Sequence, residues 1–365
     1  MPGMPVRKPH IEILRIIAIY LVVASHTPAC GMPFQSAEAS VGTFAMICAT
    51  AFSKIAVPLF FMISGALLIP KKESIAQLFK KRISRMAIII ILFVAIQYAF
   101  YYFTAPADAP PLGWTSFIRD VYHGDVEHSY VIQAWAVWFP YAYMGLLLSL
   151  PFLRLIADRM ESHHFLYLVF LPCTLGFVIP FAYCMLTGDN PSSNGITSRM
   201  RFLIGTGSFL VFALYGYYLE NKVDIKQLSW KYCFIFLALA GASLALEGLA
   251  VICMSHRLHS PHFDIELVTL QTLNAIPCCA LYVFLKKLCA MWESHPRLVK
   301  YLGYIGAATF TVYLTEHVLR CELSCLFDDL YTRYLSSCSF ALLVTVCGIC
   351  IGLILKRIPI IKKII

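Results

Sequence analysis

The sequence predicts an all-α membrane protein in which one domain, residues 1–365, forms a polytopic bundle of about ten transmembrane helices with both termini in the cytoplasm. Three observations support this fold class. Of the 365 residues, 59% are hydrophobic and only 13% are charged, whereas soluble domains carry about 25% charged residues. The hydrophobic residues gather in long segments, and the basic residues gather between alternate segments.

The apolar segments have the length that a membrane requires. A helix needs about 20 apolar residues to cross the hydrocarbon core of a bilayer. Backbone polar groups in lipid must be satisfied internally, so segments of this length predict helices. Ten segments meet the criterion, at residues 11–29, 43–69, 85–104, 132–153, 165–186, 202–219, 229–254, 264–285, 303–325 and 338–356.

The basic residues predict how these helices are oriented. With the N-terminus in the cytoplasm, 21 of the 29 Lys and Arg residues lie in or beside cytoplasmic segments, and only five lie on the opposite side. This asymmetry is the positive-inside pattern. It accounts for the net charge of +9 without a nucleic-acid partner. We therefore predict a multi-pass protein of the inner cell membrane, with the lipid bilayer as its surroundings.

The first predicted helix carries polar residues in an apolar stretch, "LRIIAIYLVVASH". Arg15 and His26 are eleven residues apart, which places them on one helix face about 16 Å apart along the axis. Glu12 precedes Arg15 by three residues, a spacing that favours an ion pair. A buried arginine costs about 2.5–3.5 kcal/mol on insertion scales, so it indicates a functional site.

Two structural interpretations stand beside this one. Arg15 can extend to the cytoplasmic surface, and His26 can simply hydrogen-bond a neighbouring helix. His26, however, lies too deep to reach the surface, and a neutral imidazole at that depth is suited to general-base chemistry.

Three further motifs follow in order along the chain. Arg82 and Arg85 lie in "KKRISR" at the start of the third predicted helix, and Trp138 lies in the aromatic fourth helix, "AWAVWFPYAYMGLLLSLPFLR". The ninth predicted helix contains "TFTVYLTEH" at residues 309–317. Together with the arginine and histidine of the first helix, this series resembles the membrane acyltransferase 3 family over nearly the whole chain.

Two positions depart from the family's usual pattern. Ile16 stands where the family usually has glycine after the arginine. In the ninth helix the family usually has histidine three residues after Tyr313, but here Glu316 holds that position and His317 follows it. We therefore expect Tyr313, Glu316 and His317 to shape the site, and we assign no catalytic role to His317.

The resemblance implies that the protein transfers an acyl group, most often acetyl, from cytoplasmic acyl-CoA to a hydroxyl of a carbohydrate or similar acceptor. Acyl-CoA would be a co-substrate, and no permanently bound cofactor is expected. In this scheme His26 accepts the proton of the attacking hydroxyl or carries the acyl group itself. Arg15 would steady the donor or the developing charge on the thioester oxygen.

A basic cluster, defined here as Lys80, Lys81, Arg82 and Arg85, is expected to bind the phosphates of acyl-CoA. Arginines one helical turn apart can present two forks to one anion. The positive-inside pattern is the simpler explanation for part of this charge.

Other polar residues carry less functional information. Lys54 is another charge within a predicted helix, and we expect it to have a partner and to line the catalytic cavity. Pro58 and Gly65, in the same segment, should kink the helix or let another helix pack closely. The loop residues His123, Asp125, Glu127 and His128 are of metal-ligating types but lack a recognised spacing, so we predict no metal site.

Two other functions fit the same composition. A transporter that exports a polysaccharide or its lipid-linked precursor also needs many helices and buried charges, although no pair of interrupted helices in corresponding halves is evident. A catalytically silent membrane partner of a synthase is the other alternative. The sequence indicates neither the identity of the acceptor nor the oligomeric state.

Overall fold

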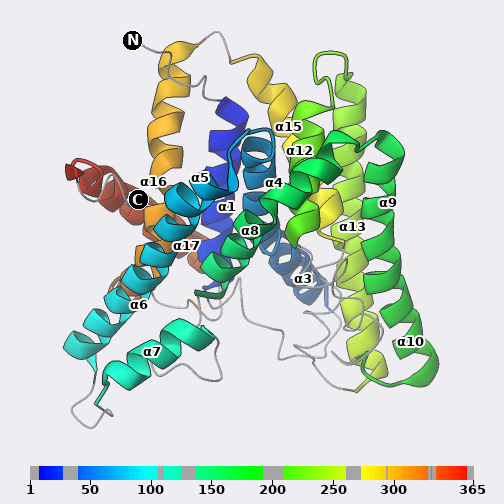
Figure 1. Cartoon of the computed structure of the whole chain (residues 1–365). Coiled ribbons are helices and arrows are strands. Elements are labelled where there is room, and N and C mark those ends of the chain that lie inside the picture. The colour runs from blue at the N-terminus through cyan, green and yellow to red at the C-terminus, as the bar shows by residue number, and fades with distance from the viewer. Residues whose placement is uncertain are drawn as a thin grey trace.

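The computed structural model describes residues 8–27, 40–105, 111–124, 137–191, 209–259, 273–292, 295–327, 330 and 334–359. Within these ranges every element is a helix and there is no strand, which confirms the predicted all-α class. The helices lie side by side as a bundle, with α1 in its interior and α9, α10 and α13 along one flank (Figure 1).

The helices in the described ranges have the following bounds: α1 Pro9–Ser25, α3 Val41–Ser53, α4 Ala56–Leu68, α5 Ile75–Leu78, α6 Ser84–Thr104, α7 Trp114–His123, α8 Trp138–Asp158, α9 Ser162–Cys173, α10 Ile179–Thr187, α12 Phe209–Asn221, α13 Trp230–Arg257, α15 Ala275–Ala290, α16 Pro296–Leu323 and α17 Tyr334–Leu355. Single π-helical turns, Phe79–Ile83 and Thr174–Val178, join α5 to α6 and α9 to α10, and a short 3₁₀ helix, Ser324–Leu326, follows α16.

Six helical segments in the described residues are long and apolar enough to cross a membrane, namely Val41–Leu68, Ile75–Thr104, Trp138–Asp158, Ser162–Thr187, Trp230–Arg257 and Tyr334–Leu355. The chain is therefore a multi-pass membrane protein. The other four predicted segments correspond to α1, α12, α15 and α16. The first three are 17, 13 and 16 residues long, and α16 is more polar. The count of ten helices and the orientation of the termini stay predictions.

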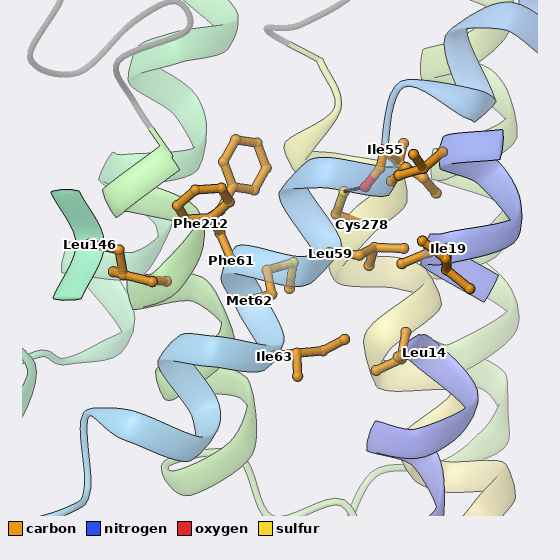
Figure 2. Close-up of a cluster of buried hydrophobic side chains, with 14 of the residues drawn as sticks. Leu14, Ile19, Ile55, Leu59, Phe61, Met62, Ile63, Leu146, Phe212 and Cys278 are labelled. Carbon is orange, nitrogen blue, oxygen red and sulfur yellow. Dashed lines mark hydrogen bonds between the residues drawn. The ribbon is translucent and has the colours of Figure 1, made fainter. Parts of the chain in front are cut away.

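Helix α1 owes its interior position to apolar residues all around it. Leu14 and Ile19 are 0% and 1% exposed, and they lie beside Ile63 and Leu59 of α4 (Figure 2). This order of contacts shows that α1 and α4 run antiparallel. Helices α15, α16 and α17 also pack against α1. A helix that is buried on several sides can hold its polar residues away from lipid.

The predicted kink near Pro58 is present. The segment Val41–Leu68 is interrupted between α3 and α4, at Lys54 and Ile55. Proline has no N–H, so the carbonyl four residues earlier, that of Lys54, loses its helical partner. Lys54 itself is half-buried. Because α1 and α4 are antiparallel, it lies at the level of the C-terminal end of α1.

Helices α4 and α12 touch through two glycines. A Cβ atom at Gly65 would overlap the backbone carbonyl of Ala213, and one at Gly216 would overlap the carbonyl of Met62. Small residues allow such close backbone contact between membrane helices, as predicted for Gly65. This crossing fixes α12 against the core of the bundle.

We expect Gly65→Val to destabilise the protein by about 3 kcal/mol or more, because the two backbones must separate to admit the side chain. Thermal unfolding in detergent measures the effect. Gly241→Val is the matched control, since a Cβ atom at Gly241 meets no atom within 4 Å. Equal unfolding temperatures for the two variants would contradict the close crossing.

Candidate active site

His26 follows the last residue of α1 and contacts α16. Its Nδ1 atom lies 2.8 Å from Oε1 of Glu316, and the two side chains are 20% and 3% exposed. An ionised carboxylate only accepts hydrogen bonds, so the ring donates from Nδ1, and in the neutral form of such a ring Nε2 carries the lone pair. The pair therefore presents a basic nitrogen at a fixed position.

Arg320 completes this arrangement one helical turn further along α16. Its Nε atom donates to Oε2 of Glu316 over 3.0 Å, and its Nη1 atom donates to the backbone carbonyl of His26 over 2.7 Å. The carboxylate thus lies between a guanidinium and an imidazole. We call His26, Glu316 and Arg320 the polar triad; it ties both the ring and the backbone of His26 to α16.

The sequence motifs described above do not include Arg320. The available signal was the four-residue spacing from Glu316 to Arg320, which favours an ion pair on one helix, inside a predicted membrane segment. Neither the spacing nor the motifs indicated that this pair would meet His26, which is 290 positions away from Glu316.

Arg15 lies at the other end of α1. Its Nη1 atom donates to both oxygens of Glu12, over 3.2 and 3.0 Å. Glu12 is 5% exposed and lies against Gly306 of α16, where a Cβ atom would overlap its carboxylate. Gly306 and Glu316 are ten residues apart, or about 15 Å along a helix. Arg15 and His26 therefore share the side of α1 that faces α16 but belong to separate polar contacts.

The basic cluster contains an internal ion pair. Arg82 donates from Nε and Nη2 to the two oxygens of Glu73, over 2.8 and 2.7 Å. Arg154 of α8 donates to the backbone carbonyl of Glu73 over 2.9 Å. The hydrogen bond from Arg82 lowers the pKa of Glu73 below its usual value. Lys81 and Arg85 are exposed.

A series of contacts connects the basic cluster to the polar triad. The π-helical turn that contains Arg82 packs against α8, where the ring centre of Tyr143 lies 6.3 Å from that of Phe139. The Phe139 ring in turn lies 5.3 Å from that of Tyr313 on α16, which precedes Glu316 by one helical turn. The predicted donor site and His26 are therefore joined by adjoining side chains of α8 and α16.

Several other predicted residues border this series. Trp138 is 37% exposed, and its ring lies 6.2 Å from that of Phe139. Tyr313 also stacks on Phe93 of α6, with ring centres 5.6 Å apart. His317 is buried, and its ring meets Phe100 edge to face at 5.8 Å. These positions are consistent with a shaping role for Trp138, Tyr313 and His317.

A second buried charge cluster joins α1, α12 and α15. Glu220 binds Lys8 at 2.6 Å and His10 at 3.0 Å, and it accepts a hydrogen bond from the Tyr282 hydroxyl over 2.9 Å. Lys286 donates to three backbone carbonyls nearby, those of Leu219, Glu220 and Val223. Each charge has an opposite or polar partner, and these contacts connect the three helices.

The loop considered for metal binding lies mostly beyond what the structure describes, because Asp125, Glu127 and His128 fall outside the described residues. Within the described part of the chain, no group of three or more His, Cys, Asp or Glu side chains is placed to hold a metal ion.

Comparison with known families agrees with this architecture. A family model described as an acyltransferase domain, that of the acyltransferase 3 family, matches residues 9–357. The match includes α1, the basic cluster, α8 and α16, and hence every residue of the contact series. No curated protein and no solved structure matches the chain.

Proposed function

The chain belongs to the acyltransferase 3 family of membrane acyltransferases, and on that premise we propose that it moves an acetyl group from cytoplasmic acetyl-CoA to a hydroxyl of a cell-surface carbohydrate, across the inner cell membrane. The observation that carries this proposal is the buried contact between His26 and Glu316. A histidine held through Nδ1 by a carboxylate is a recurring arrangement in general-base catalysis of acyl transfer.

His26 performs the proton transfers of the reaction. Its Nε2 atom takes the proton of the acceptor hydroxyl while the acceptor oxygen bonds to the acyl carbon. The carbon–sulfur bond then breaks, and the thiolate of CoA receives the proton from the imidazolium. Glu316 keeps the ring in position and stabilises its positive charge between the two steps.

The same nitrogen could instead attack the thioester and carry the acyl group as an acyl-imidazole. Rapid acid quenching of a reaction with labelled acetyl-CoA separates the two routes. Label on the protein that is lost in a His26→Ala variant would establish the covalent route, and label on the acceptor alone would establish the general-base route.

The basic cluster is proposed as the site for the CoA phosphates. Its position supports this, since the turn that contains Arg82 packs against α8, and aromatic side chains of α8 contact Tyr313 of α16. Glu73 now occupies the guanidinium fork of Arg82, and a phosphate would take its place with similar bidentate geometry. Arg15 lies near the N-terminal end of α1, at the level where the antiparallel α4 ends and the chain continues to the basic cluster. It is proposed to hold the donor rather than the reacting carbonyl.

We expect Glu73→Gln to lower the KM for acetyl-CoA by about 3- to 5-fold with kcat unchanged. The substitution removes both a competitor for Arg82 and a charge that repels phosphate, and partly exposed ion pairs contribute up to about 1 kcal/mol. Initial rates at several acetyl-CoA concentrations measure this KM. Glu161→Gln on an exposed turn is the control, while Arg82→Gln should raise KM. An unchanged or higher KM for Glu73→Gln would contradict phosphate binding at Arg82.

The experiment that tests the function itself is acyl transfer by purified protein in vesicles. Labelled acetyl-CoA is supplied outside vesicles in which the basic cluster faces the medium, together with carbohydrate acceptors of different classes. Label recovered on an acceptor hydroxyl supports the proposal. Movement of the unmodified carbohydrate across the membrane without transfer of label would favour the exporter, and neither activity would favour a silent partner.

A further inference from the structure

Arg320 has one nitrogen that the polar triad does not use. Its Nε and Nη1 atoms are hydrogen-bonded to Glu316 and to the carbonyl of His26, whereas Nη2 is buried from solvent without a hydrogen-bond partner among the described residues. A buried donor that lacks a partner costs about 1–3 kcal/mol, and more when it is charged. Its cost would be offset if Nη2 had a partner during the reaction.

The two bonded nitrogens fix where the third one points. The guanidinium is planar and rigid, with five N–H donors in a set geometry. Nε is bonded to the carboxylate that holds the His26 ring, and Nη1 is bonded to the His26 carbonyl, so Nη2 is held in the same plane as these two contacts. The side chain as a whole is 15% exposed, so its charge acts where water is largely excluded.

The acyl transfer proposed above generates negative charge near this point. When a hydroxyl attacks a thioester, the carbonyl oxygen becomes an oxyanion, and a fixed donor in a low-dielectric site stabilises it. Arg15 is poorly placed for this purpose, because its Nη1 atom is bound to Glu12 and α1 separates it from His26 by about 16 Å. Arg320, by contrast, contacts His26 directly, through the backbone carbonyl of that residue.

We infer that Arg320 is a catalytic residue whose Nη2 atom donates a hydrogen bond to the acyl carbonyl oxygen as the tetrahedral intermediate forms. This inference rests on the proposed acyl transfer. The π electrons of the carbonyl move to the oxygen as the new carbon–oxygen bond forms, and His26 Nε2 takes the hydroxyl proton. When the carbonyl re-forms, the carbon–sulfur bond breaks and the imidazolium returns the proton to the thiolate. The guanidinium remains charged throughout.

A structural explanation competes with this inference, namely that Arg320 only holds Glu316 in place. Substitutions made in two backgrounds separate the explanations. Arg320→Met is compared with its parent in the otherwise native protein and again in a Glu316→Gln protein, with kcat and the KM for acetyl-CoA measured in each. Arg257→Met, which removes an arginine at the end of α13, is the matched control, and thermal unfolding in detergent confirms that each variant is folded.

The inference predicts that Arg320→Met lowers kcat by about 10²- to 10³-fold, with little change in KM, and that a loss of at least 10-fold persists in the Glu316→Gln background. If the arginine acts only through Glu316, its removal from the Glu316→Gln protein will cost less than about 3-fold, and the inference is wrong. Wild-type protein that transfers no acetyl group would refute the proposed function instead.

A second variant keeps the inference testable if the Arg320→Met protein does not fold. Arg320→Lys keeps the positive charge, but a single ammonium cannot serve the carboxylate, the His26 carbonyl and an acyl oxygen in the positions of a guanidinium fork. We expect kcat to fall by at least 10-fold while the unfolding temperature stays near that of the wild type. A wild-type kcat for Arg320→Lys would overturn the inference.

Discussion

Replacing His26 by alanine should lower acyl transfer by about 10²- to 10⁴-fold, the contribution of a positioned general base, while the protein still folds and enters the membrane. The side chain is 20% exposed, lies just beyond the last residue of α1 and contacts Glu316 of α16, so its loss leaves the apolar core of α1 intact. Steady-state rates with labelled acetyl-CoA, together with an unfolding curve in detergent, measure the two parts of this prediction.

The control for this variant is His163→Ala. That residue lies in the exposed first turn of α9, 3.5 Å from Glu161, so its removal should leave acyl transfer unchanged. Full activity of the His26→Ala protein would remove the reason to place the reaction at the polar triad. Loss of activity together with loss of folding would be resolved with His26→Gln, which keeps a donor to Glu316 but supplies no base.

Replacing Glu316 by alanine should lower kcat by about 10²-fold or more, and Glu316→Gln should have a smaller effect, near 10-fold. The carboxylate holds Nδ1 of His26 and stabilises the imidazolium, two roles whose loss is costly in acyl-transfer sites. Glutamine can still accept the hydrogen bond from Nδ1 but carries no charge. Alanine does neither and also leaves Arg320 without its carboxylate, which predicts a lower unfolding temperature.

Glu322→Ala is a suitable control for both Glu316 variants, because it removes an acidic residue near the end of the same helix, α16. The kcat values should decrease in the order wild type, Glu316→Gln, Glu316→Ala. Equal kcat values for the glutamine and alanine variants would show that the hydrogen bond to His26 has no part in the reaction. Unchanged kcat in both would exclude Glu316 from the site.

The fold class was readable from the sequence because it follows from bulk properties. A chain with 59% hydrophobic residues and 13% charged residues cannot cover a water-soluble surface, and the segment lengths then require helices. The close packing at Gly65 and the break before Pro58 were also predictable, since each depends on one residue and its neighbours. The helix count was not confirmed, because α1, α12 and α15 are shorter, within the described residues, than a full membrane crossing.

The site was predictable only in part. His26 could be recognised as unusual by its depth in an apolar helix, and the Glu12–Arg15 spacing was visible along one helix. The partner of His26 could not be predicted. Contacts between α1 and α16 join residues far apart in the sequence, and a single sequence does not reveal them. Glu316, where the family usually has histidine, is the residue that binds His26.

The pairing of Arg82 with Glu73 could not be predicted from the sequence for a similar reason. The sequence shows a basic stretch with one acidic residue nine positions before Arg82. In the structure Ser74 and Gln77 form a capping box that starts α5 directly after Glu73, and Arg82, in the π-helical turn that follows, bonds back to Glu73. A basic stretch in the sequence can thus contain arginines that are already paired in the folded protein.

The most direct test of this account is a structure of the full chain with bound acetyl-CoA. The account predicts phosphates at Arg82, a thioester carbon near the polar triad within about 3.5 Å of an acceptor oxygen or of His26 Nε2, and its carbonyl oxygen within hydrogen-bond distance of Arg320 Nη2. Acetyl-CoA bound with its thioester remote from His26, or with its phosphates away from the basic cluster, would contradict it.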